Sequence, residues 1–228
     1  MGYPLTHSLS PKIHQMFAAQ FNLVITYDLI TTKEDKLTEN LSQFIANGGS
    51  GLNITAPLKE ILFQRTYLPG NNLSLIAQYS GSVNTITIQP DGSLYGENTD
   101  GIGLVRDLLF RHAIIIKQKH ILILGAGGAA RGIICQLLEQ QPASISIVTR
   151  DSYKARAVAI NFAKFGEVFV ETYNQLKIDK FDLVINATAT SFNDLRKLCP
   201  NIMFSDAVYY DLNYRFKNND SFAKPVIN

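Results

Sequence analysis

Apolar and polar positions alternate with two different periods along the first half of the chain. Apolar Ile13, Phe17 and Phe21 recur at a spacing of four, which predicts a helix over residues 11–21. Ser10 is expected to be its N-cap, because a proline follows at the first helical position. The same criteria predict a strand over 26–30, an amphipathic helix over 33–46, a strand over 52–54, a helix opened by Thr55 and Pro57, a hairpin over 83–88 and 94–96, and a helix over 100–111.

The second half of the chain begins with a βαβ unit. Residues 120–124 are a continuous apolar run, which is typical of a parallel strand that is buried on both faces. A glycine-rich turn, a helix to residue 139 and a strand over 144–149 follow. The apolar segments 181–186 and 207–212 are predicted as further strands. This order of elements predicts a parallel sheet of the Rossmann type.

The turn after residue 124 has the spacing G-x-G-x-x-A of dinucleotide-binding proteins. Gly125 permits the tight turn, Gly127 lets backbone amides approach a pyrophosphate, and Ala130 allows the helix to pack closely. The spacing alone is a weak signal, but its place between a strand and a helix favours nucleotide binding. The residues expected to contact the cofactor here are Gly125, Ala126, Gly127, Gly128 and Ala129.

The strand over 144–149 ends where NAD-selective enzymes usually carry an acidic residue that holds the ribose. In this chain Thr149 and Arg150 stand at that end, and Lys154 follows one helical turn later. Two cations suit a 2′-phosphate, so the sequence favours NADP. Two alternatives stay open: a pair of solvated charges, and a site in which Asp151 offsets the cations and NAD is used.

Two polar motifs precede the nucleotide turn and supply an ammonium and a carboxylate. Lys59 lies in the first turn of the helix that Thr55 and Pro57 open, and Asp100 begins the helix over 100–111. From these residues alone Lys59 is equally a surface lysine, and Asp100 a helix-capping aspartate. If the fold brings both groups to one nicotinamide site, they would carry out the proton transfer that accompanies hydride transfer.

Composition excludes several other classes. The chain has 228 residues, of which 46% are hydrophobic and 18% charged, and a net charge of +2, so no nucleic-acid-binding surface is predicted. Cys135 and Cys199 form no Cys-x-x-Cys pair, which predicts no disulfide framework and favours a reducing cytoplasm. His7 and His14 have no third ligand near them in sequence, so no metal is expected. No apolar run approaches the length of a membrane span.

Taken together, these segments resemble the shikimate dehydrogenase family. The matching motifs run in family order through residues 2–14, 53–60, 81–85, 96–101, the nucleotide turn and 186–188. Several motifs in one order are far more specific than any of them alone. The resemblance implies a two-domain α/β enzyme, with an N-terminal α/β substrate domain over residues 1–99 and a C-terminal Rossmann-like NADP-binding domain over 100–228.

The resemblance also implies roles for individual residues. It makes Lys59 the general acid and base and Asp100 its partner in the reversible NADP-dependent reduction of 3-dehydroshikimate to shikimate. Ala187 and Thr188 match positions that contact the cofactor. The residues that match substrate-holding positions of the family are Ser8, Ser10, Thr55, Asn84 and Tyr214. Short hydroxyl and amide side chains suit a buried polyhydroxylated acid.

The chain departs from the family pattern at both ends. The family's first strand and the C-terminal helices that return to the substrate domain are expected to be lacking. Three functions therefore stay open: an active shikimate dehydrogenase, a non-catalytic nucleotide- or ligand-binding remnant, and a quinate or shikimate dehydrogenase that uses NAD. The sequence is compatible with a monomer or a homodimer.

Overall fold

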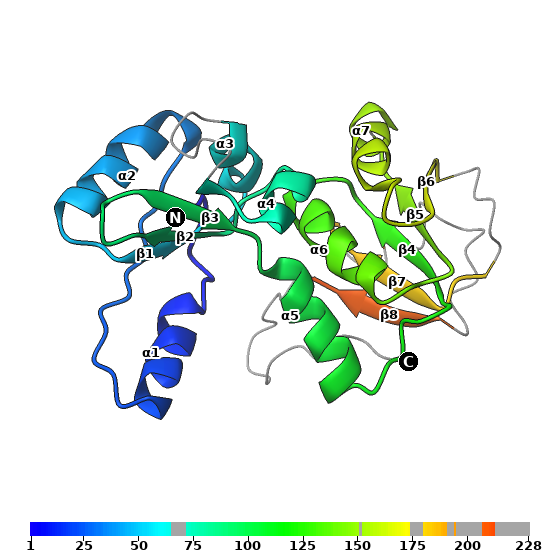
Figure 1. Cartoon of the computed structure of the whole chain (residues 1–228), viewed down its shortest axis with the longest axis horizontal. Helices are drawn as coiled ribbons and strands as arrows, with labels where there is room; N and C mark the ends of the chain where they lie inside the picture. The colour runs from blue at the N-terminus through cyan, green and yellow to red at the C-terminus, as the bar shows by residue number, and fades with distance from the viewer. Residues whose placement is uncertain (65–71, 151, 174–179, 191–193, 195–206, 213–228) are drawn as a thin grey trace. The chain divides into compact units, whose positions relative to one another are not determined.

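The computed structural model describes residues 1–64, 72–150, 152–173, 180–190, 194 and 207–212. The chain forms two compact units, Met1–Asn98 and Thr99–Asn228. Each unit contains its own β-sheet (Figure 1). Within the described stretches, no helix combines the length and apolar character needed to cross a lipid bilayer. The α/β class predicted from the sequence is confirmed.

The first unit contains a three-stranded antiparallel sheet in the order β1-β2-β3. Its strands are β1 (Gly51–Asn53), β2 (Thr85–Ile88) and β3 (Leu94–Glu97). Its helices are α1 (Ser10–Gln20), α2 (Leu37–Ala46) after a 3-10 turn (Glu34–Lys36), α3 (Leu58–Gln64) and α4 (Leu75–Ser80). The predicted hairpin of β2 and β3 is confirmed. The sequence does not predict α4, whose 6 residues are too few for a periodic signal.

The core of the first unit is made by helical residues spaced four apart. Leu37 and Leu41 of α2, and Leu58 and Leu62 of α3, are at most 2% exposed. They pack in one cluster with Ile86 of the central strand β2. Full burial of each such side chain contributes about 1.5–3 kcal/mol to stability. The apolar face predicted for residues 33–46 is therefore the face that α2 buries.

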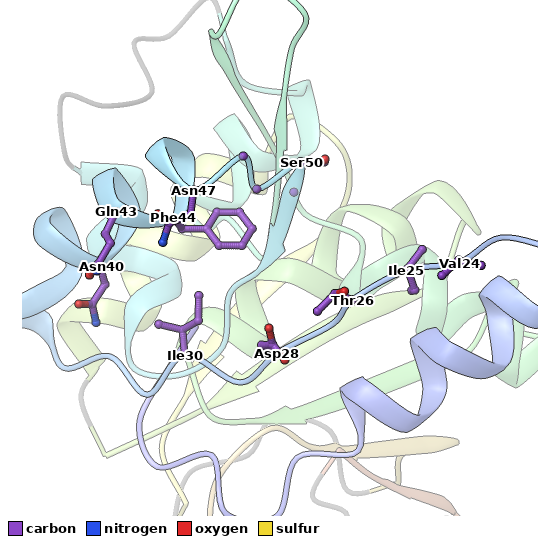
Figure 2. Close-up of a pocket in the computed structure, with 13 residues that line it drawn as sticks. Val24, Ile25, Thr26, Asp28, Ile30, Asn40, Gln43, Phe44, Asn47 and Ser50 are labelled. Carbon is purple, nitrogen blue, oxygen red and sulfur yellow. The ribbon is translucent and has the colours of Figure 1, made fainter.

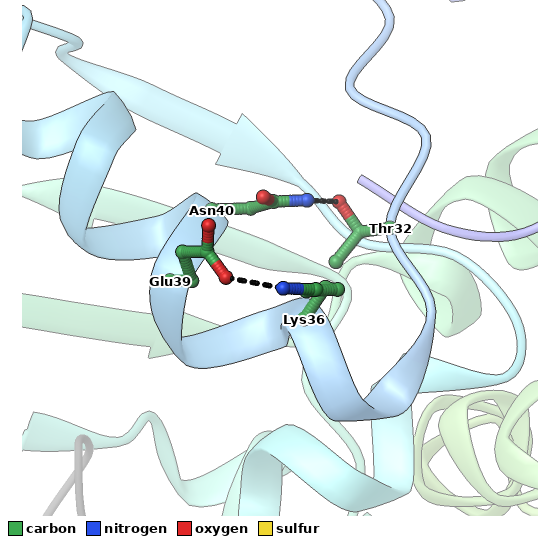
Figure 3. A network of polar contacts seen from close by, with 4 residues as sticks. All are labelled: Thr32, Lys36, Glu39 and Asn40. Carbon is green, nitrogen blue, oxygen red and sulfur yellow. Dashed lines mark hydrogen bonds and ion pairs between the residues drawn. The ribbon is translucent and has the colours of Figure 1, made fainter.

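Polar contacts fix the beginning of α2. Asn40 Nδ2 donates to Thr32 Oγ1 at 2.9 Å, and Lys36 forms an ion pair with Glu39 at 2.7 Å (Figure 3). Thr32 is fully buried, and its backbone N–H donates to the carbonyl of Gly2 at 2.9 Å. The start of the chain and the start of α2 are thereby held together.

The first residues of the chain lie beside the segment that follows β1. The amino group of Met1 donates to the Asn53 carbonyl at 2.6 Å, and the Thr55 N–H donates to the Met1 carbonyl at 2.9 Å. A Cβ at Gly2 would collide with the Thr55 side chain and lie 3.1 Å from the Ala56 carbonyl. The motif that begins at Gly2 thus requires glycine for its close contact with the Thr55 motif.

Two local predictions are wrong in this unit. Residues 26–30 form no strand. Among the described residues the nearest strand-like pairing is an isolated bridge between Gly2 and Thr31, and alternating residues cannot make a ladder without a partner strand. Ser10 is not the N-cap of α1. The N-cap is Leu9, Ser10 is the first helical residue, and the Ser10 N–H donates to Ser8 Oγ at 3.4 Å.

The second unit contains a parallel sheet of five strands in the order β6-β5-β4-β7-β8 (Figure 1). The strands are β4 (His120–Leu124), β5 (Ser144–Val148), β6 (Val168–Glu171), β7 (Leu183–Asn186) and β8 (Val208–Asp211). The helices are α5 (Asp100–Arg106), continued by a π-helical turn (Asp107–Arg111), then α6 (Gly128–Glu139) and α7 (Ser152–Phe162). Central β4 and its neighbours are buried, which confirms the predicted parallel Rossmann-type sheet. The sequence does not predict β6, whose side chains are mostly half-buried.

Helix α5 approaches α6 at a glycine. A Cβ on Gly101 would lie 2.7 Å from the Gly132 carbonyl and 2.9 Å from the Gln136 side chain. Two turns of backbone therefore meet where only a hydrogen atom fits. A Cβ on Gly103, in the same helix, would meet no other atom within 4 Å. The close contact fixes α5, and with it Asp100, within the second unit.

We expect Gly101→Ala to lower the free energy of unfolding by about 1–3 kcal/mol, because the added methyl overpacks the α5–α6 contact. Gly103→Ala is the matched control and should raise it by about 0.5–1 kcal/mol, since alanine is the better helix former. Urea denaturation of both variants measures the difference. Equal stabilities would show that the two helices do not meet at Gly101.

Candidate functional site

Lys59 is placed by the turn that precedes α3. The Leu58 N–H donates to the Thr55 carbonyl at 3.0 Å, and the Lys59 carbonyl accepts from the Val83 N–H at 3.0 Å. Lys59 is the second residue of α3 and is half-buried, so its predicted place in the first helical turn is confirmed. The backbone bond to Val83 sets Lys59 next to the segment that carries Asn84.

Asn84 is held between two other segments of the first unit. Its N–H donates to the Glu97 carbonyl at 2.9 Å, and its carbonyl accepts from the Ile54 N–H at 2.7 Å. Its side-chain Oδ1 accepts from Thr85 Oγ1 at 2.9 Å. Asn84 is 7% exposed. A buried carboxamide with its oxygen already bonded has a defined orientation, which is what a hydrogen-bonding site needs.

Ser8 and Ser10 stand at the beginning of α1, and both are half-buried. Burial raises the pKa of Tyr27, and the nearby Ser10 side chain is the smaller, opposing influence on that pKa. Tyr27 Oη donates to Asn53 Oδ1 at 2.7 Å. Tyr27, which lies beside Ser10, thus connects this region to β1, although α1 and β1 are far apart in the sequence.

Sequence reasoning missed three polar residues of this region: Tyr27, Asn53 and Thr85. Asn53 Nδ2 donates to Thr85 Oγ1 at 3.4 Å, and Thr85 contacts Asn84 as described. The polar chain of hydrogen bonds therefore runs from Tyr27, which lies beside Ser10, through Asn53 and Thr85 to Asn84. Asn53 and Thr85 stand inside matched motifs, but Tyr27 stands in none, and only the fold brings it here.

A groove of about 630 Å³ lies elsewhere on the first unit (Figure 2). Val24, Ile25 and Ile30 line one side, and Phe44 of α2 lines another. The residues from Gly48 to Gly51, which lead into β1, complete it. None of the predicted substrate residues is among those that line it. The polar chain that ends at Asn84 is therefore separate from this groove.

The nucleotide turn has the geometry that its glycines predict. Gly125 has a φ of +109°, which an L-residue with a side chain rarely adopts. A Cβ there would also lie 3.0 Å from the Thr188 methyl and 3.1 Å from the Ala187 carbonyl. Gly127 is the N-cap of α6, which no side chain caps, and Ala130 is fully buried. A helix of 12 residues that begins in this way fits a bound pyrophosphate.

Asn186 fixes the loop that touches this turn. Its Oδ1 accepts from the Thr188 N–H at 3.0 Å and from Thr188 Oγ1 at 2.8 Å. Its Nδ2 donates to the Thr190 carbonyl at 2.9 Å and to Asp211 Oδ1 at 3.1 Å. The side chain is fully buried. Asn186 thus holds Ala187 and Thr188 beside Gly125.

The remaining predicted cofactor residues lie just after β5 and in α7. Thr149 and exposed Arg150 directly follow β5, and Lys154 lies in α7. Sequence reasoning missed Arg131 of α6, whose Nε donates to the Ala126 carbonyl at 3.3 Å. An arginine one turn after a glycine-rich loop is the signal that could have indicated it, because it adds positive charge where phosphates bind.

The two predicted site residues that remain are Asp100 and Tyr214. Asp100 is the first residue of α5, follows the N-cap Thr99, and is half-buried in the second unit, whereas Lys59 belongs to the first. Tyr214 lies outside the described residues. Among the residues that the structure describes, no group of three or more side chains is arranged to hold a metal ion.

These features define the class of the protein. A parallel Rossmann-type sheet with a glycine turn at the start of α6, following a separate α/β unit, is characteristic of dinucleotide-dependent dehydrogenases. Residues 1–86 match the shikimate dehydrogenase substrate binding domain, and residues 109–198 match the shikimate / quinate 5-dehydrogenase domain. The chain belongs to the shikimate dehydrogenase family.

Individual relatives agree with this assignment. The chain is 44% identical over 219 residues to the shikimate dehydrogenase (NADP(+)) of Vesicomyosocius okutanii, covering 95% of this chain and 79% of the relative. A crystal structure of a shikimate dehydrogenase in complex with NADP+ has a TM-score of 0.79 at 33% identity, covering 93% and 75% of the two chains. The shikimate 5-dehydrogenase of Listeria monocytogenes, in complex with shikimate and NAD, has a TM-score of 0.79 at 26% identity, with coverages of 93% and 76%.

We expect Asn186→Asp to lower the free energy of unfolding by about 3 kcal/mol at pH 7. The new carboxylate would face Asp211 and the Thr190 carbonyl, which accept hydrogen bonds and donate none, so a buried charge would be left uncompensated. Chemical denaturation measures the loss, and cofactor titration should show weaker binding because repulsion from the Thr190 carbonyl and Asp211 displaces the loop that carries Thr188. Asn161→Asp, at an exposed position of α7, is the control and should change stability by less than about 0.5 kcal/mol. A stable Asn186→Asp variant would contradict the role of the Asn186 side chain.

Proposed function

We propose that the chain catalyses the reversible NADP-dependent reduction of 3-dehydroshikimate to shikimate. The observation that carries the proposal is the match to NADP(+)-dependent shikimate dehydrogenases over 95% of the chain, with the lysine-bearing and asparagine-bearing motifs bonded to each other. The Val83 N–H bond to the Lys59 carbonyl joins those motifs. The first unit would bind the substrate and the second the cofactor.

The substrate is a polyhydroxylated ring acid, which needs many short donors and acceptors. Ser8, Ser10, Thr55 and Asn84 supply hydroxyl groups and a carboxamide from one unit, and we assign them to the substrate's carboxylate and hydroxyls. Tyr214 is assigned to the same role from its sequence motif alone. A site with paired hydrogen-bonding groups rejects analogues that lack a hydroxyl, because its own buried polar groups would then lose their partners.

Lys59 supplies the proton in this mechanism. Reduction of the 3-oxo group leaves an alkoxide on the ring carbon, and the Lys59 ammonium gives that oxygen a proton. In the oxidising direction the neutral amine takes the proton from the hydroxyl. Asp100 orients the ammonium and accepts a hydrogen bond from the adjacent substrate hydroxyl. Bound NADPH supplies the hydride in the reducing direction.

The cofactor site is assigned to residues around the carboxyl ends of the parallel strands. The turn from Gly125 to Ala129 and the start of α6 would hold the pyrophosphate. Thr149, Arg150 and Lys154 would hold the 2′-phosphate of NADP. Ala187 and Thr188, fixed by Asn186, would lie along the dinucleotide. This set fits the group, because the Gly125 conformation and the N-cap glycine, Gly127, let backbone amides at the start of α6 approach a pyrophosphate.

Steady-state assays with shikimate and quinate, each with NADP and NAD, test the proposal together with a cofactor-binding titration. Turnover of shikimate with NADP supports it. A higher kcat/KM for quinate or for NAD would support a sister activity, which the shikimate / quinate domain match makes the second candidate. Cofactor binding without any turnover would identify a non-catalytic member.

We predict that Lys59→Ala lowers kcat by on the order of 10² or more while it largely spares shikimate binding, because only the proton transfer is lost. Lys36→Ala removes an exposed lysine whose ion pair with Glu39 is worth little, and its kcat should equal that of the wild type. Kinetics and shikimate titration of both variants provide the measurement. An unchanged kcat in Lys59→Ala would remove this lysine from the mechanism.

Arg150→Ala should raise KM for NADP roughly 10- to 100-fold and leave KM for NAD within about twofold, since one or two charge-assisted hydrogen bonds to a 2′-phosphate are lost. Arg156, exposed on α7, is the control, and Arg156→Ala should leave both constants unchanged. Equal changes for the two cofactors would mean that Arg150 does not read the 2′-phosphate.

A further inference from the structure

Helix α1 carries two of the proposed substrate residues but buries little of its own surface. Its apolar Ile13, Met16 and Phe17 are 38%, 57% and 52% exposed, and Ala18 is its one buried residue. Burial of apolar area therefore contributes little to fixing α1 on the first unit. Whatever sets the position of Ser8 and Ser10 must be a small number of specific contacts.

Tyr27 supplies such contacts through its aromatic ring and through its hydroxyl group. Its ring stacks on that of His14 in α1, with centroids 4.3 Å apart and an interplanar angle of 12°. Its hydroxyl donates to Asn53 Oδ1 of β1 at 2.7 Å, with the Ser10 side chain of α1 nearby. One side chain from the segment between α1 and α2 thus joins α1 to the edge strand of the sheet.

The orientation of each amide along this chain follows from the Tyr27 bond. Because the Tyr27 hydroxyl occupies Asn53 Oδ1, the Asn53 amino group is the part that reaches Thr85 Oγ1, at 3.4 Å. The Thr85 hydroxyl then donates a hydrogen bond to Asn84 Oδ1, at 2.9 Å. Donors and acceptors are ordered in one direction from Tyr27 to Asn84. Burial raises the pKa of Tyr27, so the phenol keeps the proton that it donates through mildly alkaline pH.

We propose that Tyr27 is a positioning residue of the substrate site: it sets Ser10 relative to Asn84 by stacking on His14 of α1 and bonding Asn53 of β1 at once. The proposal rests on the proposed function, because it assigns Tyr27 to the shikimate site. Tyr27 acts through Ser10 and Asn84 and does not itself take part in proton or hydride transfer. Its loss should therefore weaken the binding of substrate and leave the chemical step intact.

Tyr27→Phe keeps the ring that stacks on His14 and removes only the hydroxyl. We expect KM for shikimate to rise roughly tenfold, with kcat within about twofold and KM for NADP unchanged. Tyr95→Phe is the matched control, because the described residues show no side-chain hydrogen bond for Tyr95 of β3, and its constants should stay at wild-type values. An unaltered KM in Tyr27→Phe, or a fall in kcat alone, would overturn the assignment.

A double-mutant cycle tests whether Tyr27 acts through Ser10. If it does, Tyr27→Phe should raise KM by less in a Ser10→Ala background than in the wild type, since the hydroxyl that Tyr27 positions is already absent. Full additivity would contradict the proposal. Should Tyr27→Phe not fold, His14→Leu removes the stacking contact from the other side, and it should raise KM for shikimate with kcat retained. An unaltered KM in His14→Leu would then overturn the assignment.

The wild-type assay separates this proposal from the proposed function. If the wild type binds shikimate without turnover, the dissociation constant for shikimate replaces KM in every comparison. A wild type that neither binds nor oxidises shikimate overturns both proposals. An active wild type with an unaltered Tyr27→Phe variant overturns only the role of Tyr27.

Discussion

The first unit depends on the backbone hydrogen bonds on either side of Ile54 and Thr55. The Ile54 N–H donates to the Asn84 carbonyl at 2.7 Å, and the Thr55 N–H donates to the Met1 carbonyl at 2.9 Å. Buried backbone groups must be paired, so three segments that are distant in sequence are forced side by side. Each of the three carries polar residues of the candidate site. The site is therefore a consequence of how this short stretch of backbone satisfies its own donors.

In the second unit, side-chain hydrogen bonds hold the residues of the candidate cofactor site together. Asn186, at the end of β7, satisfies its carboxamide on Thr188, Thr190 and Asp211. In a parallel sheet the carboxyl ends of the strands meet at one edge, which is where a dinucleotide binds. One buried amide at that edge thus defines the loop against which the Gly125 turn closes. A fully satisfied buried polar network specifies one conformation, and here that conformation shapes the proposed cofactor site.

Tyr27 shows how a weakly buried element can still be placed accurately. Helix α1 leaves most of its apolar side chains exposed, yet its first turn is joined to β1 through a stacked ring and a hydrogen bond of 2.7 Å. Directional contacts specify orientation, whereas apolar burial mainly supplies stability. The same distinction explains why residues 26–30 need no strand partner in order to carry a structurally important side chain.

The sequence by itself determined the elements whose signals are local. The apolar period of α2, the long buried run of β4 and the glycine spacing before α6 each depend on neighbouring residues, and each predicted its element correctly. Tertiary structure alone decided that residues 26–30 have no ladder, and that Tyr27 and Asn53 are joined beside the candidate substrate residues. Those outcomes depend on which distant groups become partners. Hydrogen bonds between residues far apart in the chain leave no periodic trace in the sequence, because nothing in the local pattern of either partner depends on the other.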